Sequence, residues 1–201
     1  MTNNLFAKLT GALVMLAGLT AHADDIRLGI PAYGGTGCPA GTASAILSPD
    51  RKTLSVLFDQ YQAEAGGASG RMLDRKSCNL AVPVHVPQGF SISIFQIDYR
   101  GFAAVPFGGQ ARFNVEYFFA GSAGPRSSKT VRGPTNQDYD LTDRLAAAAL
   151  VWSPCGASTN LRINSSLMVT TNRNLDDAIA TVGSADIKAG IVYHIQWRRC
   201  M

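Results

Sequence analysis

The sequence predicts an all-β domain, folded as an antiparallel two-sheet sandwich, and three observations lead to this prediction. Turn-forming residues are frequent, with 20 Gly and 9 Pro among 201 residues. The segments between these breaks mostly alternate apolar and polar side chains, as strands with one buried face do. Four cysteines in a chain that begins with an export signal indicate a disulfide framework.

Each predicted strand rests on a period of two residues. The alternating segments are 53–59, 80–87, 90–95, 112–119, 161–169 and 191–198. Six or more short strands separated by turn residues are typical of immunoglobulin-like or jelly-roll-like sandwiches. Pro83 has no N–H to donate to a neighbouring strand, so we expect its strand to run along a sheet edge.

Two segments depart from this alternation. Residues 142–150, with Thr142 as a potential N-cap before an alanine run, are predicted equally as a short helix or as a strand leading into Trp152. Residues 121–134 are rich in Gly, Ser and Pro, and we expect a mobile loop there. No internal repeat or long linker divides the chain.

The first 23 residues have the features of a cleavable signal peptide. One positive charge, at Lys8, precedes an apolar run from Leu9 to Leu19 that is too short to cross a bilayer. Small residues at Ala21 and Ala23 form a processing site, so cleavage is predicted between Ala23 and Asp24. Residues 24–201 then form a single domain in an extracellular or periplasmic location.

The charge balance argues against a nucleic-acid partner. The chain has 18 Lys and Arg against 14 Asp and Glu, a formal net charge of +4. The basic residues are spread along the chain, apart from Arg126, Lys129 and Arg132 and the pair Arg198-Arg199. Nucleic-acid-binding proteins usually carry a denser basic stripe. We therefore expect no nucleic-acid partner. We also expect no membrane insertion, because no segment after the signal approaches membrane-spanning length.

The cysteines are Cys38, Cys78, Cys155 and Cys200. An even number in an exported chain favours two disulfides, and four cysteines allow three pairings. We favour Cys38–Cys78 with Cys155–Cys200, because each pair then closes one half of the chain. The sequence has no Cys-x-x-Cys spacing and only two histidines after the signal, so we expect no metal site and no cofactor.

Several short motifs together are similar to a known family. They include Gly37-Cys38-Pro39 near the mature start, Asp98-Tyr99-Arg100-Gly101 in the middle and Trp152-Ser153-Pro154-Cys155 later. Their order and spacing resemble the domain of unknown function 4360 family, small secreted proteins of bacteria and fungi. The resemblance implies a secreted domain with the four cysteines as its framework. It implies no established activity and supplies no catalytic residues.

Catalytic arrangements find little support in the sequence. His85 and His194 fall on the outward phase of predicted strands, and no Gly-x-Ser-x-Gly turn accompanies them. Asp59, Asp98 and Glu116 are the candidate carboxylates for a hydrolase, although an internal contact with Arg100 or a turn cap explains Asp98 more simply. A calcium site would draw on residues that do not fit the EF-hand spacing: Asn174, Asp176, Asp177 and Asp186.

The candidate binding residues include aromatic side chains. Trp152 and Trp197 each precede a cysteine by three residues and are expected to pack in the core beside a disulfide. Tyr33, Tyr61 and Tyr99 lie near predicted turns and are the candidate ligand-binding aromatics, together with the polar pair Asp98 and Arg100. The stretch 164–166 is an N-glycosylation sequon, relevant in a eukaryotic secretory route.

The sequence favours a non-catalytic function. We predict a secreted module that binds a carbohydrate or protein of a cell surface or matrix through loops at one end of the sandwich. The alternatives are a secreted hydrolase that uses carboxylates and a structural or inhibitory protein whose stapled fold is its function. The signal peptide thus predicts the location of the protein and does not identify its ligand.

Overall fold

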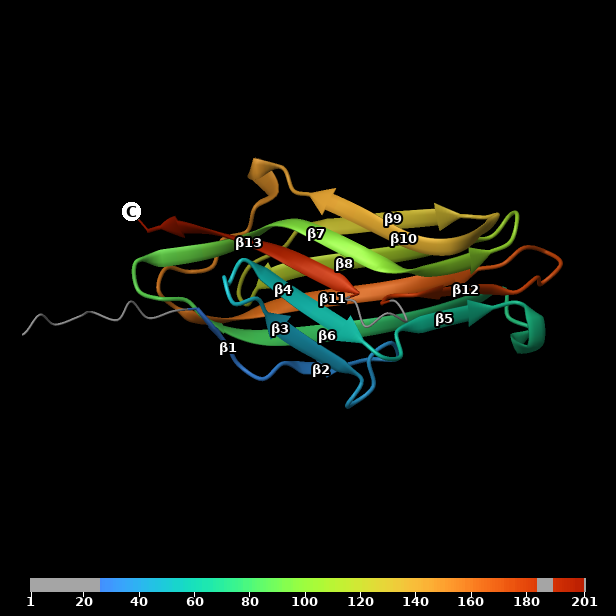
Figure 1. Cartoon of the computed structure of the whole chain (residues 1–201), viewed down its shortest axis with the longest axis horizontal. Coiled ribbons are helices and arrows are strands. Elements are labelled where there is room, and N and C mark those ends of the chain that lie inside the picture. Colours follow the sequence, from blue (N-terminus) through green and yellow to red (C-terminus); the bar gives the residue numbers. More distant parts are fainter. Residues whose placement is uncertain (1–25, 184–189, 201) are drawn as a thin grey trace, which may run out of the picture.

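The structure, a computed structural model, describes residues 26–183 and 190–200, and it confirms the all-β prediction. Within these ranges two antiparallel sheets pack face to face, with two short 3₁₀ turns and no α-helix (Figure 1). The strands are β1 (Arg27–Leu28), β2 (Ala32–Gly34), β3 (Ala43–Leu47), β4 (Thr53–Phe58), β5 (Gln62–Ala65), β6 (Leu73–His85), β7 (Phe90–Val105), β8 (Gln110–Phe119), β9 (Arg126–Arg132), β10 (Thr135–Arg144), β11 (Ser158–Thr170), β12 (Ala178–Thr181) and β13 (Ile191–Arg199). The turns are η1 (Gly67–Ser69) and η2 (Ala147–Ala149).

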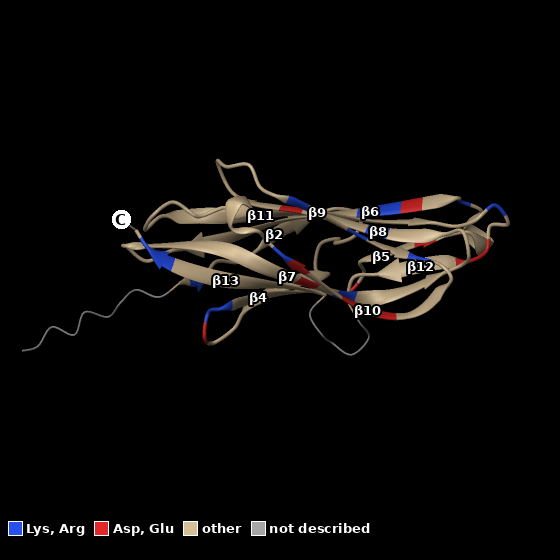
Figure 2. Cartoon of the chain, turned by 90° about the horizontal axis from the view of Figure 1, so that it is seen from above, with Lys and Arg blue, Asp and Glu red and all other residues tan. Residues whose placement is uncertain are grey.

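The two sheets have different layouts. Sheet A runs in the order β1-β6-β11-β8-β9, and β2 pairs with β6 beside β1. Sheet B runs in the order β3-β4-β13-β7-β12-β5, and β10 pairs with β7. The long strand β7 has β10 along one edge, with β13 and then β12 along the other. Seen from above, the two sheets form separate layers (Figure 2).

Each of the six predicted strands overlaps a strand of the structure, although 53–59 and 80–87 extend one and two residues past the ends of β4 and β6. The two irregular segments differ from their predictions. The predicted loop at residues 121–134 is corrected, because β9 pairs along seven residues of β8, from Glu116 opposite Arg126 to Gln110 opposite Arg132. Its Ser and Gly content suggested a loop, but the edge of β8 offers it a complete hydrogen-bonding partner. Residues 142–144 end strand β10, and the alanine run forms only the 3₁₀ turn η2.

The structure corrects the prediction that the strand of Pro83 runs along a sheet edge. β6 is the last long strand of sheet A, but the short strands β1 and β2 both pair with its outer side. Pro83 lies opposite the gap between them, where the N–H of Gly29 donates to the Pro83 carbonyl at 2.8 Å. The missing proline N–H is therefore accommodated by interrupting the covering strand.

The core lies between the two sheets and is built from their inward positions. Aliphatic side chains such as Leu54, Val82, Ile97 and Val169 are fully buried there. Tyrosines add polar groups, and the hydroxyl of Tyr61 lies 3.0 Å from the Ser165 hydroxyl. The buried hydroxyls of Tyr99, Tyr117 and Tyr193 have no hydrogen-bond partner among the described residues. Burial raises the pKa of each of these tyrosines above its ordinary value.

Two disulfides join the pairs that the sequence analysis favoured. Cys38, between β2 and β3, bonds to Cys78 on β6, and both residues are buried. Cys155, before β11, bonds to Cys200 at the end of β13. Near the second bond, Trp197 packs edge-on against Phe90, and the guanidinium of Arg198 lies 4.1 Å from the centre of the Trp152 ring. Both tryptophans are half-buried at the end of the sandwich.

Candidate functional site

Two rows of polar side chains cross the outer face of sheet A. Strand pairing places Asn164 of β11 between Asn79 of β6 and Glu116 of β8, and Arg126 of β9 follows Glu116. Two residues further along each strand, the pairing forms a second row of Ser77, Ser166, Asn114 and Ser128. We call these eight residues the polar rows. Strands lie about 4.8 Å apart, so each row spans roughly 14 Å.

Alternation along the strands explains why both rows face outward. The residues between the two rows on β6, β11 and β8 point into the core and are buried: Cys78, Ser165 and Val115. The hydroxyl of Ser165 donates to the carbonyl of Cys78 at 3.1 Å. The inward phase is thus held by packing and a disulfide, which fixes the opposite phase toward solvent.

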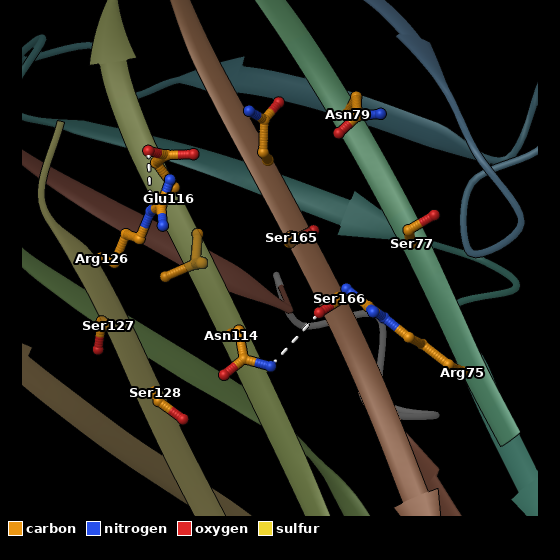
Figure 3. Close-up of a pocket in the computed structure, with 12 residues that line it drawn as sticks. Arg75, Ser77, Asn79, Asn114, Glu116, Arg126, Ser127, Ser128, Ser165 and Ser166 are labelled. Carbon is orange, nitrogen blue, oxygen red and sulfur yellow. Dashed lines mark hydrogen bonds and ion pairs between the residues drawn. The ribbon is translucent and has the colours of Figure 1, made fainter. Parts of the chain in front are cut away.

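The polar rows enclose a hollow of about 460 Å³ (Figure 3). Three of the four side chains in the second row are serines, which are shorter than the side chains in the positions on either side. Arg75, from the neighbouring position on β6, extends toward Ser166 in this view. The short serines therefore form a depression, and amide, carboxylate and guanidinium groups surround it.

Some polar groups of the hollow are paired, and others are not. The Nε of Arg126 lies 3.1 Å from the Oε1 of Glu116, and the amide of Asn114 donates to the hydroxyl of Ser166 at 3.4 Å. The side chains of Asn79 and Asn164 form no hydrogen bond with another described residue. Each amide offers two N–H donors and one carbonyl acceptor. The unpaired amides are thus available to a polar ligand.

Arginines border the polar rows. Arg162 stands next to the first row on β11, while Arg75 and Arg112 flank Met168 next to the second row. None of the three forms an ion pair with a carboxylate in the described part of the chain. The buried Nε of Arg112 also has no acceptor there. The face therefore has cationic groups that no acidic side chain of the described residues neutralises.

The outer face of sheet B holds a different cluster, centred on Asp98 of β7. His194 Nε2 lies 2.7 Å from Asp98 Oδ2, Thr142 donates to Oδ1 at 2.8 Å, and the amide of Gln96 lies 3.1 Å from Oδ1. Burial alone would raise the pKa of Asp98, but the hydrogen bonds from His194, Thr142 and Gln96 outweigh it and lower the pKa. The carboxylate thus joins β7 to β10 and β13.

This cluster leads to a prediction about acid stability. A carboxyl whose pKa is lowered by folding stabilises the protein above its unfolded pKa of about 3.9, and loses that effect as the pH falls through the folded pKa. Asp98→Asn should therefore cost about 1–2 kcal/mol at pH 7, because a charge-assisted hydrogen bond is lost. The cost should shrink below about pH 4. Urea unfolding at several pH values measures both quantities.

The control is Asp140→Asn on the same face. Asp140 contacts Arg100 at 3.1 Å, but its side chain is 61% exposed. An exposed ion pair contributes little, so this variant should follow the wild type across the pH range. A cost for Asp98→Asn that stays constant from pH 7 to pH 3 would contradict the assignment.

The predicted ligand-binding residues lie in separate places. Tyr61 and Tyr99 are each 1% exposed and pack inside the sandwich. Tyr33 is half-buried at β2, where its hydroxyl accepts the N–H of Gly41 at 2.9 Å. Asp98 and Arg100 share the outer face of sheet B, yet Arg100 pairs with Asp140 rather than with Asp98. A binding role for Tyr33, Asp98 or Arg100 stays a prediction.

The three candidate carboxylates are not brought together. Asp98 faces outward from sheet B, and Glu116 faces outward from sheet A on the opposite side of the sandwich. Asp59 follows β4 and lines a separate hollow with Gln60, Gln62 and Asp138. Hydrolysis by a pair of carboxylates needs the two groups within about 10 Å across one cleft. Glu116 and Asp59 line separate hollows, and Asp98 lines neither of them.

The histidines and acidic loop residues also have local explanations. The Nδ1 of His85 lies 3.0 Å from the Ser158 hydroxyl, and His194 is held by Asp98. Asn172 hydrogen-bonds to the carboxylate of Asp176 at 2.7 Å, and Asp186 lies outside the described residues. Across residues 26–183 and 190–200, no three His, Cys, Asp or Glu side chains gather in a way that could hold a metal ion.

The polar rows were not identified from the sequence. The outward phase of residues 112–119 shows Asn114 and Glu116, and the outward phase of residues 161–169 includes Asn164. The missing information is that β6 and β9 lie on either side of these strands, because pairing between distant segments leaves no local signal. The sequence also predicted a loop over the stretch that contributes Arg126 and Ser128.

The two sheets and two disulfides define the class of this protein: a small, disulfide-stapled β-sandwich of the secreted type. The family described as Domain of unknown function (DUF4360) matches residues 24–200, so the chain belongs to this family. A relative from Arthroderma benhamiae, described as an uncharacterized secreted protein, is 37% identical over 178 residues. The alignment covers 88% of this chain and 73% of the relative.

These findings confirm the family resemblance and the secreted location. The matched region begins at residue 24, directly after the predicted cleavage point. The signal peptide itself lies outside the described residues. Among the described residues, no helix is long and apolar enough to cross a membrane.

Proposed function

We propose that this secreted protein is a non-catalytic carbohydrate-binding module and that its ligand lies along the polar rows of sheet A. The observation that carries the proposal is the serine-floored hollow between the unpaired amides of Asn79 and Asn164 and the arginines that border it. This position differs from the sequence-based prediction of binding through loops at one end of the sandwich, because the polar rows lie in the middle of sheet A.

The chemistry of the polar rows suits a sugar. A saccharide presents hydroxyls that both donate and accept, and it needs partners of both kinds at fixed positions. The polar rows supply hydroxyls and amides, with a guanidinium and a carboxylate beside them. Because the backbones of β6, β11, β8 and β9 are joined by ladder hydrogen bonds, little ordering of the site is needed on binding.

The same geometry favours a sugar over a protein partner. The core of a protein–protein interface is usually apolar and rich in aromatic residues. None of the large apolar side chains that the described residues expose lines the hollow: Ile30, Ile46, Met72, Leu73, Phe95 and Phe107. The separation of Asp59, Asp98 and Glu116 likewise favours binding over hydrolysis.

A double variant tests the proposal. The wild-type mature protein, produced without its signal peptide, should bind a subset of glycans on an array. Asn79→Ala/Asn164→Ala should weaken binding to the same glycan roughly tenfold, because two hydrogen bonds of about 0.5–1.5 kcal/mol are removed. Isothermal titration with the purified glycan measures the change.

Asn136→Ala provides the matched control. Asn136 is an exposed asparagine on β10 of sheet B, opposite Ala104, and its loss should leave affinity unchanged. The host should lack N-glycosylation, since Asn164 belongs to the sequon and a glycan there would cover the hollow. Binding to no glycan, or equal affinity for the double variant and the wild type, would overturn the proposal.

A further inference from the structure

We infer that the ligand of the polar rows is an acidic polysaccharide, one whose sugars carry carboxylate or sulfate groups. This inference rests on the proposed carbohydrate binding and narrows the class of ligand. It is carried by the placement of arginines around the polar rows and by the charge difference between the two faces of the sandwich.

The outer face of sheet A is strongly basic. The outward positions of its four long strands, all of them described, carry five arginines and one carboxylate: Arg75, Arg112, Arg126, Arg132 and Arg162, with Glu116. Arg126 pairs with Glu116 at 3.1 Å, which neutralises that carboxylate. The remaining guanidinium groups leave an excess of positive charge around the hollow.

Sheet B does not share this excess. Its outward positions on β5, β7, β10 and β13 include Glu64, Asp98, Asp138 and Asp140 against Arg100, Arg144 and Arg198, so acidic and basic groups nearly balance. Arg100 is paired with Asp140, and Arg144 donates to the side chain of Gln96. The modest net charge of the whole chain, +4, is therefore distributed unevenly between its two faces. A sequence total hides such an asymmetry.

The arginines stand where a chain crossing the hollow would meet them. Arg162 adjoins the first polar row, and Arg75 and Arg112 adjoin the second on either side of β11. A polymer over the serines would thus have guanidinium groups at both ends of its path. A guanidinium binds a carboxylate or sulfate through two parallel N–H groups, a geometry that a neutral sugar hydroxyl does not use.

Nucleic acid is the other common polyanion, and this face suits it less well. Single-stranded nucleic acid binding relies on aromatic side chains on which bases stack, next to a basic groove. Six of the eight residues in the polar rows are serines or asparagines, and none is aromatic. Phe118, opposite Arg162, lies outside the lining of the hollow. Hydroxyls and amides surrounded by arginines therefore suit an acidic polysaccharide better than a nucleic acid.

The decisive comparison keeps the sugar backbone and changes only its charge. Oligogalacturonides should bind the wild-type protein at least about tenfold more tightly than their methyl esters, and the affinity should fall as salt rises from 50 to about 300 mM. Dextran sulfate compared with dextran forms the second arm, which distinguishes sulfate from carboxylate as the recognised group. Tighter binding of either acid supports the inference and identifies its source.

Charge removal then locates the interaction. Arg75→Gln/Arg162→Gln should weaken binding of the acidic oligosaccharide roughly tenfold, as expected for two exposed ion pairs. It should leave the weak binding of the neutral ester unchanged. Arg100→Gln on sheet B is the matched control and should alter neither affinity.

The outcomes separate this inference from the proposed function. Equal binding of the acid and its methyl ester would overturn the inference and leave carbohydrate binding intact. Binding to no glycan would overturn both. Binding of a single-stranded oligonucleotide more tightly than any acidic glycan at the same salt would also overturn the inference, since nucleic acid would then be the preferred polyanion.

Discussion

Replacing Cys38 and Cys78 with alanine should lower the free energy of unfolding by about 4 kcal/mol or more. The two residues are 40 positions apart, and on the chain-entropy model a loop of that length contributes about 4 kcal/mol. Both residues are also buried in the core, with Cys38 at 0% and Cys78 at 1% exposure, so their removal leaves a cavity. Urea unfolding of the mature protein, followed by circular dichroism, measures the loss.

The second disulfide supplies the comparison. Cys155 and Cys200 are 45 positions apart, so the entropic contribution of their loop is similar. Cys155 is exposed and Cys200 is only half-buried at the end of the sandwich, so little core volume is lost. Cys155→Ala/Cys200→Ala should therefore destabilise less than the first pair. If Cys155→Ala/Cys200→Ala lowers the free energy of unfolding more than the first pair does, burial of the cysteines does not explain the difference between the two disulfides.

Gly101→Ala should destabilise the protein by about 2–3 kcal/mol, although it adds a single methyl group. A Cβ at this position would lie 2.1 Å from the carbonyl oxygen of Thr181 and 2.5 Å from the hydroxyl of Tyr139. These two atoms are themselves hydrogen-bonded at 2.6 Å. The methyl group would push β12 and the tyrosine away from β7. The cost is steric, and thermal unfolding should show it as a lowered midpoint.

Gly34→Ala is the matched control. Gly34 ends strand β2, and a Cβ there would meet nothing within 4 Å. The same chemical change should therefore alter the midpoint only slightly, within about 0.5 kcal/mol. Equal destabilisation by both variants would point to strand propensity rather than to close packing at Gly101.

The predictions from the sequence succeeded where the signal is local. Leu54 and Val56, or Phe113 and Val115, alternate with polar neighbours, and every segment predicted on that basis overlaps a strand. The strand at residues 126–132 was not predicted from alternation, because its core-facing side is not apolar. Lys129 points inward and pairs with Asp143 of the opposite sheet at 3.3 Å, an interaction that no local pattern reveals.

The candidate site residues also depend on contacts between distant segments, which no local sequence pattern reveals. For Asp98 the sequence predicts an internal contact with Arg100 or a turn cap. Neighbours on adjacent strands lie closer to each other than residues two positions apart on one strand. In the structure Asp98 contacts His194 of β13, and Arg100 contacts Asp140 of β10. The sequence places Tyr99 near a predicted turn, but the inward phase of β7 buries it.

The sequence by itself determined the export signal, the β class, the inward and outward phase of the main strands and the four-cysteine framework. Each of these follows from composition or from a repeat over neighbouring residues. The tertiary structure alone decided which strands lie side by side, and so brought Asn79, Asn164, Glu116 and Arg126 into one row. Sheet pairing joins residues far apart in the chain through backbone hydrogen bonds, which every residue can accept and every residue except proline can donate. It therefore leaves little trace in the side chains that form the face.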